Sequence, residues 1–530
     1  MSPTTPSSTF KDVLVVGTVS CITMLNMFLS GALTVAIPTI GQDLHFKEGD
    51  LQWPVTVFSL AYGCALLFFG RIGDIVGGRT MFLVGSVWFA AWSLGAAFAP
   101  NPTALIVFVA MLGLGAAANT PAGIGIFVGY FPQGPRRNNA FGVLGAGQPV
   151  GYILGLVLGG VIAQSPITWR GIFYVQTAFA AFFVILGLLV LDKDDSTSDE
   201  RRYKKGLDWG GAIMSIAGIG LLTYSLAATA EAPKGWATPY LIVLICISVV
   251  ILVIFWFYEQ WRERRAMAVL MPPSIWSQPG AKMPAVIGMI FFAWWSFNTM
   301  LYISTLYYQQ VKLLPPLQTS IRFLPTIICA IGTNLAGGWL MNFVLGLPLI
   351  LMAVTANILA ALLFALIDVQ ASYWRMSFWV MSLLAGADLV YPIGTLQVSA
   401  AFSEDSKSLA GGVFIVATRL GTSIGVAVTS SIATAVSKKY NESHPGIPHE
   451  SPEVVMVGLR AAGWTLCGAA VISFIIALIG LRGIGIVGQK PQVFGSQRLS
   501  DGDTEQIGSQ SEEESRAPED ATVTAAVAPI

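Results

Sequence analysis

Long apolar runs alternate with short polar loops along this chain of 530 residues. A helix needs about 20 mostly apolar residues to cross a lipid bilayer, and fourteen runs of roughly that length are present. We therefore predict an all-α integral membrane protein with fourteen transmembrane helices, an even number that places both termini on the same side. The runs lie at about 13–37, 52–70, 80–99, 103–128, 140–163, 171–191, 208–229, 238–258, 284–308, 319–341, 346–367, 374–400, 409–436 and 456–482.

The loops between these runs differ in charge. If the termini are cytoplasmic, 19 of the 29 lysines and arginines lie in cytoplasmic segments, nine lie in outside loops, and Arg419 lies within a run. Cytoplasmic loops of membrane proteins collect Lys and Arg, so we expect both termini in the cytoplasm. The longest outside loop then holds Asn441-Glu442-Ser443, a sequon that makes Asn441 a candidate glycosylation site.

Two charged stretches divide the runs into groups of six, two and six. The last segment of the chain holds eight acidic and three basic residues, a composition typical of a disordered tail. The predicted organisation is a cytoplasmic N-terminal tail at 1–12, a six-helix bundle at 13–191, a cytoplasmic linker at 192–207, two extra helices at 208–258, a second linker at 259–283, a second six-helix bundle at 284–482 and the acidic cytoplasmic tail at 483–530.

Composition narrows the function classes. Only 11% of the residues are charged and 54% are hydrophobic, whereas a soluble domain has about 25% charged residues. A net charge of zero argues against nucleic acid as a partner. The five cysteines lie in apolar runs without C-x-x-C spacing and the three histidines lie in loops, so we expect no metal site and no cofactor. No Walker lysine motif and no nucleophile–base pair is present, which argues against direct use of ATP and against an enzyme.

The loop between the second and third runs combines glycine and charge in the order G-x-x-x-D-x-x-G-x-R. Glycine allows the backbone of another helix to approach closely. Asp74 can cap the N-terminus of a neighbouring helix, where the macrodipole favours an anion, and the two arginines can bind helix C-terminal carbonyls or carboxylates. An ordinary basic cytoplasmic turn is the alternative. The candidate gating residues are Gly70, Arg71, Gly73, Asp74, Gly77 and Arg79.

The fifth run contains glycines spaced four residues apart, which places them on one helix face. A face of small residues allows two helices to approach closely, and packing alone is the simplest interpretation. The candidate helix-packing residues are Gly147, Gln148, Pro149, Gly151, Gly155, Gly159 and Gly160.

The 70–79 loop resembles the loop between helices two and three of the major facilitator superfamily of secondary transporters. The 6+2+6 arrangement, the stretch WRGIFY at 169–174 and the stretch LDWGG at 207–211 resemble the 14-spanner drug:proton antiporter family. Within that family the chain looks closest to fungal aminotriazole-resistance-type and metabolite efflux transporters. The resemblance implies the major facilitator fold, two rocking bundles, a small-molecule substrate, a proton as coupling ion and Asp74 as the latch of the gate.

The chain departs from the family pattern at several positions. Leu29 stands where an acid of the first span is expected, and Val109 and Leu112 stand where an Arg and a Gln of the fourth span are expected. That Arg is the residue usually assigned to proton coupling, so proton antiport rests here on the family resemblance alone. The glycine face of the fifth run is similar to the antiporter motif, with Leu156 in place of its proline.

Asp388 and Arg419 are the ionisable residues deepest in the predicted spans. Charge at membrane depth is costly and usually faces a cavity or a partner. Our hypothesis is that Asp388 binds the coupling proton or a cationic part of the substrate, with Arg419 as its alternate partner; the alternative is a structural ion pair. Aromatic and amide groups that suit an amphiphilic organic molecule are Asn26, Gln148, Tyr152, Trp294, Trp295, Asn298, Tyr302, Asn334, Tyr391 and Gln397.

Together these patterns predict a multi-pass membrane transporter that moves small organic compounds out of the cell by alternating access. The expected substrates are drugs, toxins or a fungal secondary metabolite, and the expected driving force is the proton gradient. We expect a monomer in the lipid bilayer of the plasma membrane, with the vacuolar membrane as the alternative. Two other functions stay open, namely a carrier for a small polar or inorganic solute and a non-transporting membrane sensor.

Overall fold

The computed structural model describes residues 9–46, 53–194, 206–229, 232, 235–277, 282–401, 407–444, 446–448 and 451–482. Most of these residues are helical, and all belong to one of two units of the chain, residues 1–489. The predicted acidic tail at 483–530 and most of the predicted linker at 192–207 lie outside the described residues.

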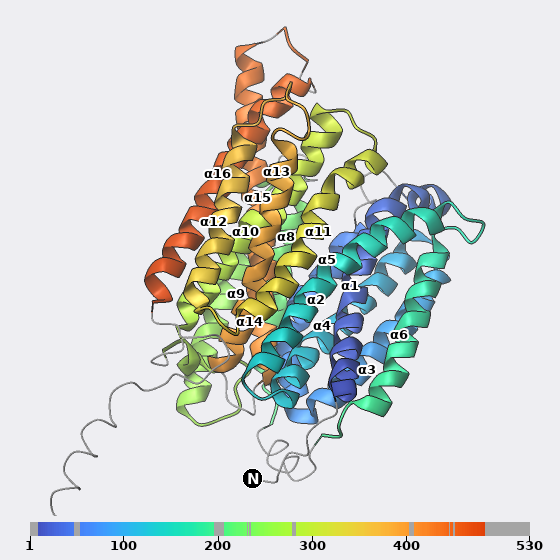
Figure 1. The fold of residues 1–530 in the computed structure, drawn as a ribbon, viewed down its shortest axis with the longest axis vertical. Helices are drawn as coiled ribbons and strands as arrows, with labels where there is room; N and C mark the ends of the chain where they lie inside the picture. Colours follow the sequence, from blue (N-terminus) through green and yellow to red (C-terminus); the bar gives the residue numbers. More distant parts are fainter. Residues whose placement is uncertain are drawn as a thin grey trace, which may run out of the picture. The chain divides into compact units, whose positions relative to one another are not determined.

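Fourteen helices of the described residues are long and apolar enough to cross a membrane, which confirms the predicted all-α fold with fourteen spans (Figure 1). Several of them begin at proline, whose missing N–H is tolerated in the first helical turn. Asn101 shows how such a helix starts, because its side chain accepts a hydrogen bond from the backbone N–H of Ala104 at 2.8 Å. This satisfies one of the N–H groups that have no partner within the helix.

The first six helices pack against one another, most extensively α1 on α5, α3 on α4 and α2 on α4. We refer to them as the N-bundle. They are α1 (Thr9–Leu44), α2 (Trp53–Val76), α3 (Gly78–Ala97), α4 (Pro102–Tyr130), α5 (Pro135–Ala163) and α6 (Arg170–Val190).

The last six spans form a second group, the C-bundle, in which α10 packs on α15 and α16, and α12 packs on α16. One of its spans is interrupted, because a 3₁₀ turn, η5, separates two shorter helices. The elements are α10 (Met283–Leu306) with the π turn η4 (Tyr307–Val311), α11 (Pro316–Leu340), α12 (Gly346–Ala365), α13 (Ser377–Leu384), η5 (Ala385–Leu389), α14 (Val390–Ala401), α15 (Lys407–Ser443) and α16 (Pro452–Gly480).

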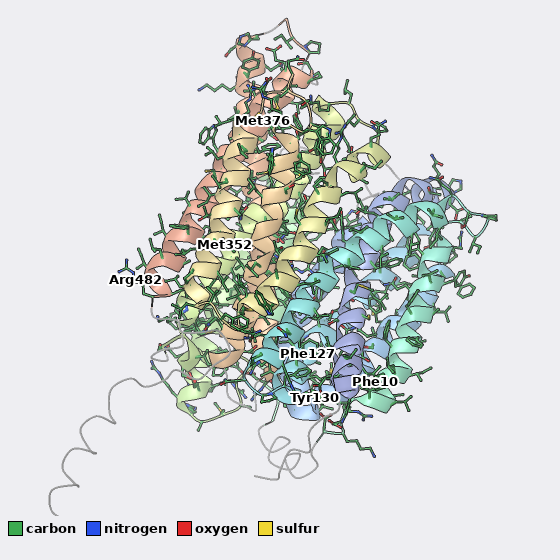
Figure 2. All side chains as sticks on the ribbon, viewed as in Figure 1. Phe10, Phe127, Tyr130, Met352, Met376 and Arg482 are labelled. Carbon is green, nitrogen blue, oxygen red and sulfur yellow. The ribbon has the colours of Figure 1, made fainter. Side chains whose placement is uncertain are left out.

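Side chains fill the interior of each bundle and cover its outside (Figure 2). Phe127 of α4 is fully buried, whereas Met352 of α12 is 56% exposed. Exposed apolar side chains are costly in water but not in lipid, so these outer faces suit contact with a bilayer.

Between the bundles the chain forms a helical hairpin of α8 (Trp209–Ala228) and α9 (Pro239–Arg264), followed by the short 3₁₀ helix η3 (Pro273–Ser277). The α8 helix contacts both α2 and α15. On the α2 side, the ring of Tyr224 stacks on that of Trp53 with centroids 5.7 Å apart. The hairpin therefore touches both bundles.

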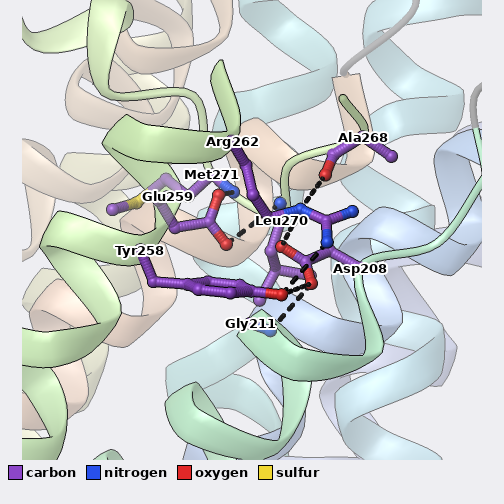
Figure 3. A network of polar contacts seen from close by, with 8 residues as sticks. All are labelled: Asp208, Gly211, Tyr258, Glu259, Arg262, Ala268, Leu270 and Met271. Carbon is purple, nitrogen blue, oxygen red and sulfur yellow. Dashed lines mark hydrogen bonds and ion pairs between the residues drawn. The ribbon is translucent and has the colours of Figure 1, made fainter. Parts of the chain in front are cut away.

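A buried polar network holds one end of this hairpin together (Figure 3). Asp208 caps α8, accepting a hydrogen bond from Gly211 N at 2.9 Å, and pairs with Arg262 of α9 at 3.1 Å. Glu259 of α9 is fully buried and accepts hydrogen bonds from the backbone N–H groups of residues 270–271, each at 3.2 Å. The network therefore ties both helices of the hairpin to the segment that leads into η3.

Candidate functional site

Asp74, near the end of α2, connects the two bundles. Its side chain is buried, and its two carboxylate oxygens accept hydrogen bonds from the backbone N–H groups of Ser408 at 2.8 Å and Leu409 at 3.1 Å. These groups lie in the first turn of α15, where N–H groups lack partners within the helix and the macrodipole favours an anion. An acid of the N-bundle thus caps a helix of the C-bundle.

The glycines around Asp74 make this approach possible. A Cβ atom added to Gly70 would lie 3.2 Å from the carbonyl oxygen of Ser408, and one added to Gly73 would lie 3.3 Å from the Ser408 side chain. Gly77 has a φ of 110°, which side chains other than glycine rarely adopt, and a Cβ there would lie 2.3 Å from Asp194. Glycine is therefore required at the turn and favoured at the contact with α15.

The arginines of the loop have different surroundings. Arg79 donates a hydrogen bond to the carbonyl oxygen of Leu188 near the end of α6 at 3.0 Å, as expected for a helix C-terminus. Arg71 is also buried, and its positive charge interacts with the carboxylate of Asp74. Asp194, which the sequence analysis did not single out, caps α3 by accepting hydrogen bonds from the backbone N–H groups of Arg79 and Thr80 at 3.2 and 3.0 Å.

A second contact between the bundles joins α5 to α11. A Cβ atom added to Gly145 would lie 2.2 Å from the side-chain oxygen of Asn334, and one added to Gly142 would lie 2.9 Å from Asn334 O and from Gly338. The two backbones therefore touch. Both contacts lie near the start of α5, the end of α11 and the start of α15, at the end of the bundles that carries residues 70–79.

The glycine face of α5 packs within the N-bundle. A Cβ atom added to Gly151, Gly155 or Gly159 would lie 2.4, 2.2 or 2.7 Å from an atom of α1. The approach is looser at Gly147 and Gly160, where the nearest atoms would be 3.6 and 3.4 Å away. The stripe is therefore a helix–helix interface with α1, while its neighbours Gln148 and Pro149 are half-buried.

Gly155→Leu is expected to destabilise the protein by about 3 kcal/mol, because a side chain would overlap the backbone of α1 and force the helices apart. Leu154→Ala, on the adjacent exposed position, is the matched control and is expected to change stability by less than about 1 kcal/mol. Thermal unfolding of the purified proteins measures both effects. Equal midpoints for the two variants would contradict an interface at the glycine stripe.

Asp388 lies in the 3₁₀ turn that interrupts the C-bundle span and is only 9% exposed. Pro392 follows four residues later and cannot donate the helical hydrogen bond to the Asp388 carbonyl, which explains the irregular turn. The amide nitrogen of Asn334 donates a hydrogen bond to the carboxylate at 2.6 Å. Since Asn334 also lies against Gly145 of α5, the acid is one residue away from the contact between the bundles.

Arg419 lies in α15 and faces the N-bundle. Its guanidinium is 4.6 Å from the ring centre of Tyr62 on α2. The structure thus does not bring Asp388 and Arg419 together as an ion pair, because Asn334 occupies the acid and an aromatic ring faces the cation. Beside Arg419, Tyr391 forms a side-chain hydrogen bond with Gln148 of α5.

The other predicted polar residues are divided between several places. Trp294 joins the same group, since its ring centre is 5.7 Å from that of Tyr391. Asn26 is buried and donates a hydrogen bond to Thr120 of α4 at 3.1 Å, which fixes α1 within the N-bundle. Tyr152 has a side-chain hydrogen bond with Thr34, and Trp295 donates one to Thr429 at 3.2 Å. Tyr302 is 40% exposed, and Asn298 and Gln397 are half-buried.

Asn441 lies in the last turn of α15, where its backbone carbonyl accepts a hydrogen bond from the N–H of His444 at 3.1 Å. Its glycosylation stays a prediction. The contacts of Gly142, Gly145, Asp194 and Glu259 were missed by the sequence analysis, since none belongs to a stripe or motif that differs from ordinary helix or loop sequence.

Comparison with known families settles what kind of protein this is. The sequence profile described as Major Facilitator Superfamily matches residues 19–426. The chain belongs to the Major Facilitator Superfamily. It is therefore an integral multi-pass membrane transporter and not an enzyme.

Two sequence relatives and one solved structure show which members of the superfamily this chain is similar to. It is 30% identical to MFS-type transporter 1 of Pyricularia oryzae, over 91% of this chain and 85% of the relative. It is 28% identical to the aminotriazole resistance protein of Saccharomyces cerevisiae, over 76% of this chain and 74% of the relative. The fold is similar to that of the proton:xylose symporter XylE, with a TM-score of 0.60 and 11% identity over 91% of this chain and 98% of the other.

Proposed function

We propose that this transporter is a secondary-active exporter of small organic compounds, driven by the proton gradient through alternating access. The observation that supports it best is the Asp74 cap on α15, because it joins the two bundles through hydrogen bonds that a rocking motion would break. Relatives named for resistance to toxic compounds, such as the aminotriazole resistance protein, support export of organic molecules.

The proposed gate closes the cytoplasmic side. The charge of the short loops supports a cytoplasmic location for residues 70–79 and both termini, and the contacts of Asp74 and of Asn334 lie at the end that carries residues 70–79. The conformation described here is then one in which the cytoplasmic gate is shut. We assign the carrier to the plasma membrane, as a monomer.

Asp388 is the proposed proton site. It is shielded, hydrogen-bonded to Asn334 and one contact away from α5, so a change in its charge would act on the surface where the bundles meet. Protonation would weaken the hydrogen bond from Asn334, because a neutral carboxyl accepts less strongly than a carboxylate. This links proton binding to bundle movement.

Purified protein in liposomes with an imposed pH gradient tests this function. Radiolabelled aminotriazole, chosen from the name of the yeast relative, is expected to accumulate against its gradient on the acidic side, and a protonophore is expected to abolish the accumulation. Protein-free liposomes are the control. Accumulation that ignores both the pH gradient and the protonophore would contradict proton coupling, and no protein-dependent flux would count against aminotriazole transport.

A further inference from the structure

We propose that Arg419 binds an anionic group of the substrate, and that the transported molecules are small aromatic or amphiphilic carboxylic acids. This inference rests on the proposed transport function and names the chemical class of its substrate. It follows from where the guanidinium lies, from the groups that face it and from the kind of partner that is missing around it.

Arg419 reaches across the boundary between the bundles. It lies twelve residues after the start of α15, in the middle of a span, and its side chain is half-buried rather than sealed. Its guanidinium lies over the ring of Tyr62, and its aliphatic stem runs past Gly63, where an added Cβ would be 3.8 Å away. The charge is thus held at the N-bundle surface by a helix of the C-bundle.

Several other arginines of the described residues have carboxylate partners. Arg170 pairs with Asp43 at 2.6 Å, and Arg262 pairs with Asp208 at 3.1 Å. Arg419 forms an ion pair with no carboxylate of the described chain. A cation at membrane depth is costly without a counter-charge, and a transported anion would supply one.

Asp388, the acid that the sequence suggested as a partner of Arg419, already has a hydrogen-bond partner. Asp388 is engaged by Asn334 at 2.6 Å and is 9% exposed, whereas Arg419 is more open. Tyr391 lies within the electrostatic reach of both charges. The cation is therefore the charged group that an entering molecule can meet, and the acid is shielded from it.

The surroundings of Arg419 define the rest of the ligand. The ring of Tyr391 packs against Trp294 and Phe414 with centroids 5.7 and 5.1 Å apart, and its hydroxyl meets Gln148 of α5. Of these rings Trp294 is half-buried, so its face offers packing area to an apolar or aromatic body. The planar guanidinium fork matches a carboxylate, which it can bind through two parallel hydrogen bonds.

Equilibrium dialysis of the full-length protein in detergent tests this inference without any gradient. The probes are 1-naphthylacetate, its uncharged amide and 1-naphthylethylamine, which share one ring system and differ in charge; empty micelles provide the background. The variants are Arg419→Gln, Arg419→Lys and the control Arg322→Gln. Arg322 is a matched control because it also lies over a tyrosine ring, 4.2 Å from that of Tyr373.

We expect 1-naphthylacetate to bind about 10- to 100-fold more weakly to Arg419→Gln, the loss typical of a charged hydrogen-bond partner. Arg419→Lys is expected to lie in between, since it keeps the charge but loses the fork. Binding of the amide should change less than about threefold, and Arg322→Gln should match the wild type. Thermal unfolding of each variant separates lost binding from lost folding, and Arg419→Lys keeps the test informative if the Gln variant unfolds.

Three results would overturn the inference: no binding of 1-naphthylacetate to the wild type, equal binding of the acid and the amine, or equal loss in the Arg322 and Arg419 variants. The outcome is separable from that of the liposome assay. Binding that depends on Arg419 without pH-driven flux would refute proton coupling alone, whereas pH-driven flux of 1-naphthylacetate that is unchanged in Arg419→Gln would refute the anion site alone.

Discussion

Asp388→Asn is expected to abolish transport driven by a pH gradient while leaving folded protein at the membrane at wild-type levels. The amide has nearly the same shape as the carboxyl group and can still accept the hydrogen bond from Asn334, which is 2.6 Å in the wild type. It cannot gain or lose a proton, so a cycle that requires proton binding at this position stops.

Uptake into liposomes over a range of imposed pH gradients measures the effect. Asp368→Asn is the matched control, since Asp368 lies in a turn after α12 and accepts a hydrogen bond from the backbone N–H of Gln370 at 2.9 Å. If the Asp388 variant transports uphill with the pH dependence of the wild type, Asp388 has a structural role and the proton binds elsewhere or is not used.

Asp74→Asn is expected to slow transport by at least about tenfold. An uncharged amide keeps one acceptor for the α15 N–H groups but loses the charge that the macrodipole favours, a change of about 1–2 kcal/mol in the stability of the closed gate. The fold of each bundle should persist, because the lost contacts to Ser408 and Leu409 join the bundles rather than hold either one together.

Asp194→Asn separates gating from capping in general. Asp194 also caps a helix through two backbone N–H groups, but that helix is α3 and both partners belong to the N-bundle. Its variant should lower the unfolding midpoint with little change in transport per folded molecule. Initial rates in liposomes, normalised to folded protein, compare the two variants, and similar slowing in both would remove the special role of Asp74.

Sequence predicted the spans because bilayer crossing imposes a length and an apolar composition on each helix separately. It was less informative about where helices end: α1 continues to Leu44 and α15 to Ser443, beyond the runs that suggested them. The extra turns are polar, and hydropathy does not distinguish a helix that leaves the membrane from a loop.

The candidate site was predicted in part. Asp74 was recognisable because its motif places charge and glycine at fixed spacings in a short loop. The partner of Asp388 was not, since Asn334 lies 54 residues away on another helix and meets the acid through the packing of α11 against η5. Asp388 and Arg419 suggested a pair because they are the ionisable residues deepest in the predicted spans, but each has a separate contact, Asp388 with Asn334 of α11 and Arg419 with Tyr62 of α2.

The two-helix hairpin of α8 and α9 has a consequence for how such a chain can be lengthened. The Asp74 cap requires the end of α2 and the start of α15 to lie on the same face of the membrane. Inserting an even number of crossings between the bundles preserves that match, whereas a single added helix would invert every later span and leave the carboxylate facing the wrong end of α15. Parity, more than the length or sequence of the insert, is therefore the condition that this latch sets on chain growth between the bundles.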